Sequence, residues 1–373
     1  MLDELERNLR ATLHEHGEAA PEAPSVEVLT AAARRNARVR RRARGLVVLA
    51  LAGVVAATVA SPVLRSERRP SAATSTVPSR GGARPVDARQ FLLAVAARAE
   101  RQPAHGGAYR YEEERSSTVS TFGTGGKMGR GPAYTVELSQ TTRSWVGASR
   151  WRSVTTFEEP RFLTERDRAN WRKAGAPALR FGTAPGVKKE MPSNPSVEED
   201  TVVAVRFVVG YQELTLAQVR RLPADTARLT AWLRAAIQPA LDKRPPAGAK
   251  PEPGFQPLSV EELLFAAAAD VLGLPVDPAV RAAAFRVMAG VHGAKLMGAV
   301  TDPMGRTGTG VAFRESPDAD RVYIVDEATA DLLAQQYVPS NPARSGVRVP
   351  PGTPILSITL VESGWVDRLG QQP

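Results

Sequence analysis

The longest apolar run of the chain covers residues 45–64 and contains no charged side chain. Leucine, valine and alanine dominate the run, and Pro62, its one strong helix breaker, stands close to its end. A helix of this length rises about 30 Å, which is the thickness of the hydrocarbon core of a bilayer. The pattern therefore predicts a transmembrane helix over 45–64.

Arginines flank this run unequally. An arginine collar precedes it and consists of Arg34, Arg35, Arg38, Arg40, Arg41, Arg42 and Arg44. Three arginines follow it, partly offset by Glu67. Because positive charge gathers on the cytoplasmic side of a membrane span, we expect a cytoplasmic tail over 1–44 and an extracytoplasmic C-terminal region. The sequence thus predicts a single-pass protein of the cell membrane, with the lipid bilayer as a partner.

Three other interpretations of this region fit less well. A soluble core helix would need neighbours on every face and would not need the arginine collar. A cleaved signal peptide has a weak processing match at Thr58 and Ala60, but the 44 residues before the run exceed an ordinary n-region. Binding of nucleic acid is not needed to account for the collar, and the net charge of +10 leaves only a mild basic bias elsewhere. We therefore expect no nucleic acid partner.

The cytoplasmic tail has an apolar stripe at helical spacing, formed by Leu2, Leu5, Leu9 and Leu13. This spacing predicts a short amphipathic helix. The stripe is suited to docking a cytoplasmic protein partner, and the alternative is that it lies on the inner leaflet or self-associates. A tail of this size is too small to hold a substantial core of its own.

Residues 65–85 are predicted to form a flexible spacer, because Ser, Thr, Ala, Gly and Pro dominate residues 70–85. Residues 86–373 mix helical and strand patterns and are predicted to form an extracytoplasmic domain. A proline-rich passage at 245–257 suggests two sub-lobes, 86–244 and 258–373.

Capping residues predict where the helices of this domain begin. They are Asp87, Thr164, Thr215, Asp225, Ser259 and Asp277. Alternating or apolar runs predict strands. These strands are Tyr109–Glu113, Tyr134–Val146, Arg150–Phe157, Val202–Tyr211, Leu296–Val300, Gly308–Phe313, Val322–Val325 and Ile355–Glu362. Helices interspersed with strands that end in a meander favour an α+β fold with an antiparallel sheet, which can curve into an open half-barrel.

Composition and motifs restrict the chemistry. Cysteine is absent, which excludes disulfides, thiol catalysis and cysteine zinc sites. The sequence has no HExxH or GxSxG motif, and its four histidines stand far apart. The glycine-rich segment FGTGGKMGRGP has Met128 after Lys127 and so lacks the phosphate-loop pattern. Adjacent acids, as in 112–114 and 198–200, point to opposite faces of a strand. We predict no catalytic, cofactor-binding or metal-binding residues.

The C-terminal part contains the blocks FAAAADVLGLPVDPAVRAAAFRVMAGVHGAKLMGAVTDPMGRTGTGVAF, RVYIVDEATADLLAQQYV and ILSITLVESGW. With ERDRANWRKAGAP and ELTLAQVRRLPADTARLTAWL, these blocks make the chain similar to an uncharacterised actinobacterial family of single-pass membrane proteins. The resemblance implies an arginine-rich cytoplasmic collar and an extracytoplasmic α+β domain, and it implies no activity or catalytic residue. One departure lies in VDEATADLL, where family members tend to have Pro and Gly and this chain has Glu327 and Ala330.

The leading hypothesis is therefore a membrane-anchored extracytoplasmic binding or sensory protein without catalytic activity, with an envelope lipid or protein as ligand. The first alternative is an envelope-stress signalling regulator, similar in layout to membrane-bound anti-sigma factors or their sensor partners. The second alternative, a cell-wall hydrolase, needs converging carboxylates in a cleft. Half-barrel lipid carriers of the envelope offer a fold-level analogy only.

Overall fold

The computed structural model describes residues 87–104, 106–123, 131–182, 193–201, 207–242, 258–316, 318–341 and 345–373. The tail, the arginine collar, the apolar run and the spacer lie outside these ranges, so the span, the tail leucines and the topology stay predictions. Within the described part of the chain, no helix is long and apolar enough to cross a membrane.

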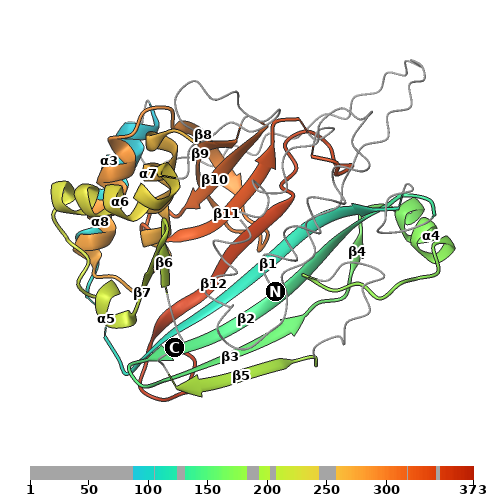
Figure 1. The fold of residues 1–373 in the computed structure, drawn as a ribbon, viewed down its shortest axis with the longest axis horizontal. Coiled ribbons are helices and arrows are strands. Elements are labelled where there is room, and N and C mark those ends of the chain that lie inside the picture. The colour runs from blue at the N-terminus through green and yellow to red at the C-terminus, as the bar shows by residue number, and fades with distance from the viewer. Residues whose placement is uncertain are drawn as a thin grey trace.

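A large antiparallel sheet organises the domain (Figure 1). Its strand order is β5-β3-β2-β1-β12-β11-β10-β9-β8, and β4 pairs with β2. The N-terminal strands are β1 (Tyr109–Phe122), β2 (Tyr134–Gly147), β3 (Arg150–Phe157), β4 (Arg161–Phe162) and β5 (Ser196–Thr201). The C-terminal strands are β8 (Lys295–Thr301), β9 (Thr307–Ser316), β10 (Ala319–Val325), β11 (Leu332–Pro339) and β12 (Leu356–Val366). A separate hairpin joins β6 (Phe207–Val209) and β7 (Gln212–Leu214). The predicted α+β class with an antiparallel sheet is confirmed.

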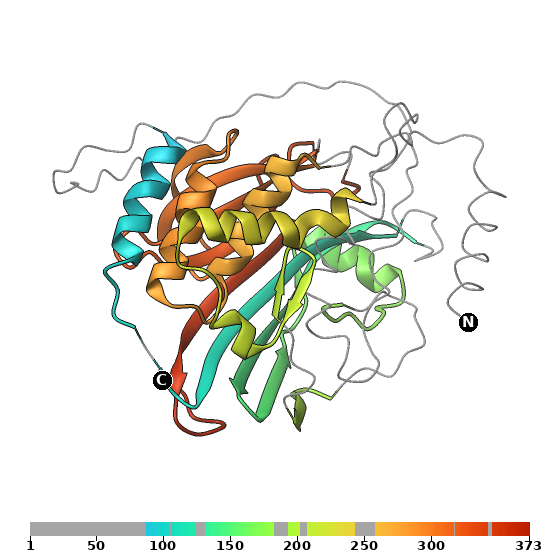
Figure 2. The same cartoon turned by 60° about the vertical axis from the view of Figure 1, so that its left-hand side comes forward.

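Four helices form a layer at one end of this sheet, as Figure 2 shows. They are α3 (Ala88–Ala99), α6 (Thr226–Leu241), α7 (Val260–Leu272) and α8 (Pro278–Ala289). Two shorter helices, α5 (Leu216–Val219) and α4 (Glu165–Lys173), lie outside the layer, and α4 stands at the far end of the long strands (Figure 1). The main core fills the space between the helix layer and β9–β11, where the rings of Phe265 and Phe313 stack 4.2 Å apart.

The sequence predicts the helix starts correctly. Five of the six predicted caps accept a backbone N–H at the start of their helix: Asp87, Thr164, Thr215, Asp225 and Ser259. Asp277 also stands at the N-cap, but its side chain makes no capping hydrogen bond, and Pro278 fixes the first turn instead.

The strands differ from the prediction at several places, and β4, β5 and β7 have no counterpart in the predicted set. β1 continues to Phe122 instead of ending at Glu113, because β2 and β12 pair with it on both sides although its sequence is polar. β11 is a full strand that the apolar pattern misses, since two glutamines interrupt its centre. Of the predicted strand Val202–Tyr211, only Phe207–Val209 is a strand among the described residues.

One face of the sheet is continuous from the helix layer to the long strands. Tyr323, in the main core, stands opposite Gln335, which stands opposite Ile358. Ile358 stands opposite Ser116, and Ser116 opposite Gln140. We call this the inner face. Because β1 pairs with β12 and α3 contacts α8, the segments before and after residue 245 share one sheet and one helix layer.

The sheet has a weak joint between its two halves. β11 and β12 pair over only four residues each, 334–337 and 356–359, and the β1–β12 register shifts between Glu113 and Glu114. Arg306, which follows the turn between β8 and β9, crosses this joint. Its guanidinium donates to the carbonyl oxygen of Leu360 at 2.6 Å and to that of Leu333 at 3.2 Å. One side chain thus bonds to the backbones of both strands where their own pairing ends.

Asp302 holds Arg306 in place. Its side chain is fully buried, and Oδ2 accepts the Arg306 Nη2 at 2.7 Å and the Nε at 2.8 Å. Oδ1 accepts the backbone N–H groups of Met304 and Arg306, each at 2.9 Å. Residues 302–305 form a tight turn, in which the Gly305 N–H donates to the Asp302 carbonyl oxygen at 3.0 Å and Gly305 adopts φ +82°. Ala330, which stands where the resembled family tends to have glycine, adopts the left-handed conformation with φ +60°. The turn therefore keeps a left-handed residue at this position.

Replacing Arg306 with alanine should lower the free energy of unfolding by roughly 2–3 kcal/mol. The change leaves the buried Asp302 carboxylate without its partner, and partial exposure of Arg306 keeps the loss below that of a fully buried pair. Urea denaturation followed by tryptophan fluorescence measures the loss. Arg150→Ala, which breaks an exposed ion pair with Glu199 on an edge strand, is the control and should cost less than about 1 kcal/mol. Equal losses in the two variants would refute the role assigned to Arg306.

Candidate ligand-binding site

The far end of the β1–β2 hairpin carries its own small core. Tyr134, Val136 and Leu138 alternate on β2 and are buried on the inner face. Helix α4 packs over them through Trp171, whose ring centroid lies 5.1 Å from that of Phe162. The sequence of α4 is mostly charged, and its apolar residue Trp171 fixes the helix to the sheet.

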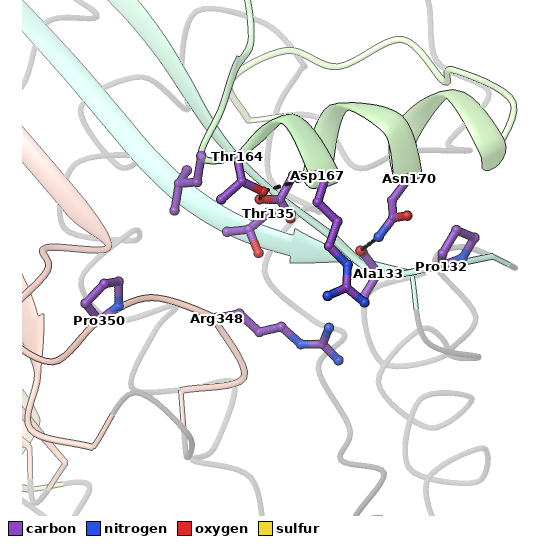
Figure 3. A pocket seen from close by; sticks show the side chains of 10 residues that line it. Pro132, Ala133, Thr135, Thr164, Asp167, Asn170, Arg348 and Pro350 are labelled. Atoms are coloured by element: carbon purple, nitrogen blue, oxygen red, sulfur yellow. Dashed lines mark hydrogen bonds between the residues drawn. The ribbon is translucent and has the colours of Figure 1, made fainter. Parts of the chain in front are cut away.

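A hollow of about 650 Å³ opens beside this core, between α4, the start of β2 and the segment 345–350 (Figure 3). We call it the tip hollow. Its lining residues are Pro132, Ala133, Thr135, Leu163, Thr164, Arg166, Asp167, Asn170, Arg348 and Pro350. Three walls that are distant in sequence therefore meet at one place.

A chain of hydrogen bonds fixes these walls to one another. The backbone N–H of Arg348 donates to Thr121 Oγ1 at 3.0 Å, and that hydroxyl lies 2.9 Å from Thr135 Oγ1. The backbone N–H of Thr135 donates to Asp167 Oδ1 at 2.8 Å, and Thr164 Oγ1 donates to Asp167 Oδ2. The network runs from the 345–350 segment through β1 and β2 to α4, so the hollow is preorganised.

Asn170 adds a further bond across the hollow. Its Nδ2 donates to the carbonyl oxygen of Ala133 at 2.7 Å, a contact drawn in Figure 3. Asp167, the only acidic residue of the lining, has both carboxylate oxygens engaged in the network. The walls are therefore held together by neutral groups and by one carboxylate. Both oxygens of that carboxylate already accept a hydrogen bond, and the lining contains no second carboxylate.

The two arginines of the lining are the groups left available. Arg166 lies in the first turn of α4, and Arg348 extends from its segment toward the Ala133 side of the hollow (Figure 3). Both residues are exposed, and neither has an ion-pair partner among the described residues. An arrangement of two free guanidinium groups in a fixed hollow can bind a ligand with acceptor oxygens.

A second polar region lies deeper on the inner face of β1 and β2. Arg110, Glu112, Glu114 and Ser116 point to this face because they alternate along β1. Burial raises the pKa of Glu112 from 4.5 to about 7, the charge of Glu114 adds to this effect, and the charge of Arg110 opposes it. Glu114 accepts a hydrogen bond from Ser116 Oγ at 2.7 Å.

Three buried donor atoms on this face have no hydrogen-bond partner: Arg110 Nε, Gln140 Nε2 and Trp151 Nε1. Gln140 is only 3% exposed, so a ligand from outside cannot reach it while the present covering stays in place. The region is therefore largely enclosed, with Arg110, Glu112 and Glu114 half-buried, and incompletely bonded polar groups there lower stability.

The structure places the residues singled out in the sequence as follows. The leucines and arginines of residues 1–44 lie outside the described residues, as do His14, His16 and His105. His292 is exposed next to Gly293, with Glu261 4.0 Å away. No group of acids and histidines suited to a metal ion occurs in the described ranges.

Sequence reasoning missed two sets of residues. The first set is Glu112 and Glu114. Adjacent residues of a strand point to opposite faces, but residues two apart share a face, so the spacing of these two glutamates could have indicated a carboxylate pair. Arg166 and Arg348 stand in polar segments with no motif, and only the fold brings them together. The capping pattern at Thr164 and Asp167 was visible in the sequence, but its connection to β2 was not.

Comparison with known proteins gives no match to a family model, to a curated protein or to a solved structure.

Replacing Glu112 with glutamine should stabilise the protein above pH 7 relative to wild type. A raised pKa means that the folded state holds the proton more tightly, so wild-type stability falls as the pH rises from 4.5 to about 7. The advantage of Glu112→Gln should therefore grow by roughly 2–3 kcal/mol between pH 5 and pH 8. Urea denaturation at both pH values measures it. Glu213→Gln, on the exposed edge of β7, controls for the loss of a carboxylate, and a pH-independent difference for Glu112→Gln would contradict the expectation.

Proposed function

We propose that the chain is a membrane-anchored extracytoplasmic binding protein without catalytic activity, and that the tip hollow is its ligand site. The single observation that carries this proposal is the pair of unpaired arginines in a hollow whose walls are fixed by hydrogen bonds. The predicted span and arginine collar of the sequence support the anchored topology.

The position of the hollow suits a binding role. β1 has 14 residues and is therefore about 45 Å long. Helix α4, which lines the hollow, stands at the far end of the long strands from the helix layer (Figure 1). The open half-barrel predicted from sequence is part of this proposal, with the helix layer as the rigid base and the long strands as the arm that presents the hollow. A ligand at the tip would reach the protein without disturbing its main core.

A binding function is favoured over hydrolysis because the lining of the hollow contains a single carboxyl group. A glycoside hydrolase uses a pair of carboxyl groups, and the hollow holds only Asp167, whose two oxygens already accept hydrogen bonds. The signalling alternative depends on Leu2, Leu5, Leu9 and Leu13, which lie outside the described residues, and no contact within the domain favours it.

Protease treatment of intact cells should degrade the region beyond residue 85 and spare residues 1–44. The positive-inside rule places these two parts on opposite sides of the membrane. Epitope tags at the two ends of the full chain report the outcome on immunoblots. A C-terminal tag protected in intact cells, together with a digested N-terminal tag, would reverse the proposed topology.

Filling the hollow should prevent ligand binding without unfolding the protein. Pro132→Trp adds a large side chain at an exposed lining position that makes no bond in the network. A soluble cell-envelope extract should slow amide hydrogen exchange of Thr135, Asp167 and Arg348 in the wild-type full chain by several-fold. The variant should show no such slowing. Ala169→Trp, on the exposed side of α4 outside the lining, is the control and should behave as wild type. Equal responses of wild type and Pro132→Trp would refute the hollow as the ligand site.

A further inference from the structure

The arginines of the tip hollow differ from three arginines on the neighbouring strands β1, β2 and β4. Arg115, Arg143 and Arg161 each form an ion pair with a glutamate. Arg166 and Arg348 have no such partner among the described residues, although both contribute to the lining of one hollow. Guanidinium groups provide five N–H donors each and stay charged at every physiological pH. The hollow therefore has an excess of donors and of positive charge.

The acid of the hollow does not remove this excess. Asp167 receives its hydrogen bonds from Thr135 and Thr164 and contributes one negative charge against two positive ones. At the start of α4, two backbone N–H groups are already engaged. The Asp167 N–H donates to Thr164 Oγ1 at 3.1 Å, and the Arg168 N–H donates to the Thr164 carbonyl oxygen at 3.2 Å. The two arginine side chains are the charged donors that the lining offers to an anion.

The other lining residues indicate which kind of anion the hollow can bind. Pro132, Leu163 and Pro350 supply apolar wall beside the guanidinium groups. A carboxylate has two oxygens in one plane and can be satisfied by a single bidentate arginine. A phosphate group presents its oxygens in a tetrahedral arrangement and can accept from two guanidinium groups that approach from different directions.

We infer that the tip hollow binds a phosphate group through Arg166 and Arg348, with the apolar wall contacting the part of the ligand next to it. This inference rests on the proposed function, because it names the ligand chemistry of the same hollow. The phosphate can belong to a free ion or to the headgroup of an anionic phospholipid, since both present the same oxygens to the arginines.

Two measurements on the full chain test the inference, the first in maltoside detergent micelles, which contain no phosphate group, and the second in nanodiscs. The first is calorimetric titration with inorganic phosphate. Arg166→Gln and Arg348→Gln should each weaken binding about tenfold, since each removes charge-assisted hydrogen bonds, and the double variant should bind no measurable phosphate. Arg172→Gln, which removes one exposed arginine of α4 outside the lining, should leave the affinity within about twofold of wild type.

The second measurement separates the two sources of phosphate. Nanodiscs that contain phosphatidylglycerol, without added phosphate, should slow amide exchange of Thr135, Asp167 and Arg348 if the headgroup is the ligand. Exchange that slows only on addition of inorganic phosphate identifies the free ion instead. Either result supports the inference.

Three outcomes would overturn it. In the first, Arg172→Gln weakens phosphate binding as much as Arg166→Gln does, which indicates general charge attraction. In the second, neither probe binds while the envelope extract still protects the hollow of wild type but not of Pro132→Trp, so that the proposed function survives with another ligand. In the third, neither the probes nor the extract acts on the hollow, and the proposed function fails as well.

Discussion

The pair of Asp302 and Arg306 is the contact on which the shape of the domain depends. The ten-stranded sheet has two halves, and their direct pairing between β11 and β12 is limited to four residues on each strand. Arg306 bonds to carbonyl oxygens of both strands beyond that short ladder, while the fully buried Asp302 fixes its guanidinium. The helix layer covers one half, and the long strands β1, β2 and β12 extend from the joint. A charged pair at this joint satisfies backbone groups that an apolar side chain would leave unbonded.

The long strands give the protein a site away from its core. A second, smaller cluster of aromatic residues under α4 stabilises the end of the β1–β2 hairpin, and the hydroxyls of Thr121 and Thr135 connect that end to the segment of Arg348. Fixed walls reduce the ordering that a ligand would otherwise require, which favours binding at such a place. The inner face between the two cores is polar, burial there raises the pKa of Glu112, and three buried donors on it have no partner, each of which costs stability.

Local signals in the sequence predict much of this fold, and long-range ones do not. Asp87, Thr164 and Ser259 identify helix starts because capping depends on residues only three positions away. β1 is mostly polar and gains its full length by pairing with β2, while β12, more than 200 residues away, covers its other side over residues 109–118, which no periodicity records. The same limit applies to the candidate site. The cap at Thr164 could be predicted, but the meeting of Arg166 with Arg348 depends on sheet pairing and on a loop far along the chain.

The central claim is that two arginines from distant segments form one anion site, and the location of a bound oxyanion tests it most directly. Selenate has the tetrahedral shape of phosphate, and its selenium can be located by anomalous diffraction from crystals of the full chain soaked in it. The account predicts an anomalous peak within the tip hollow, in contact with the guanidinium groups of both Arg166 and Arg348. Peaks confined to other arginines, such as Arg172 on the outside of α4, would contradict it.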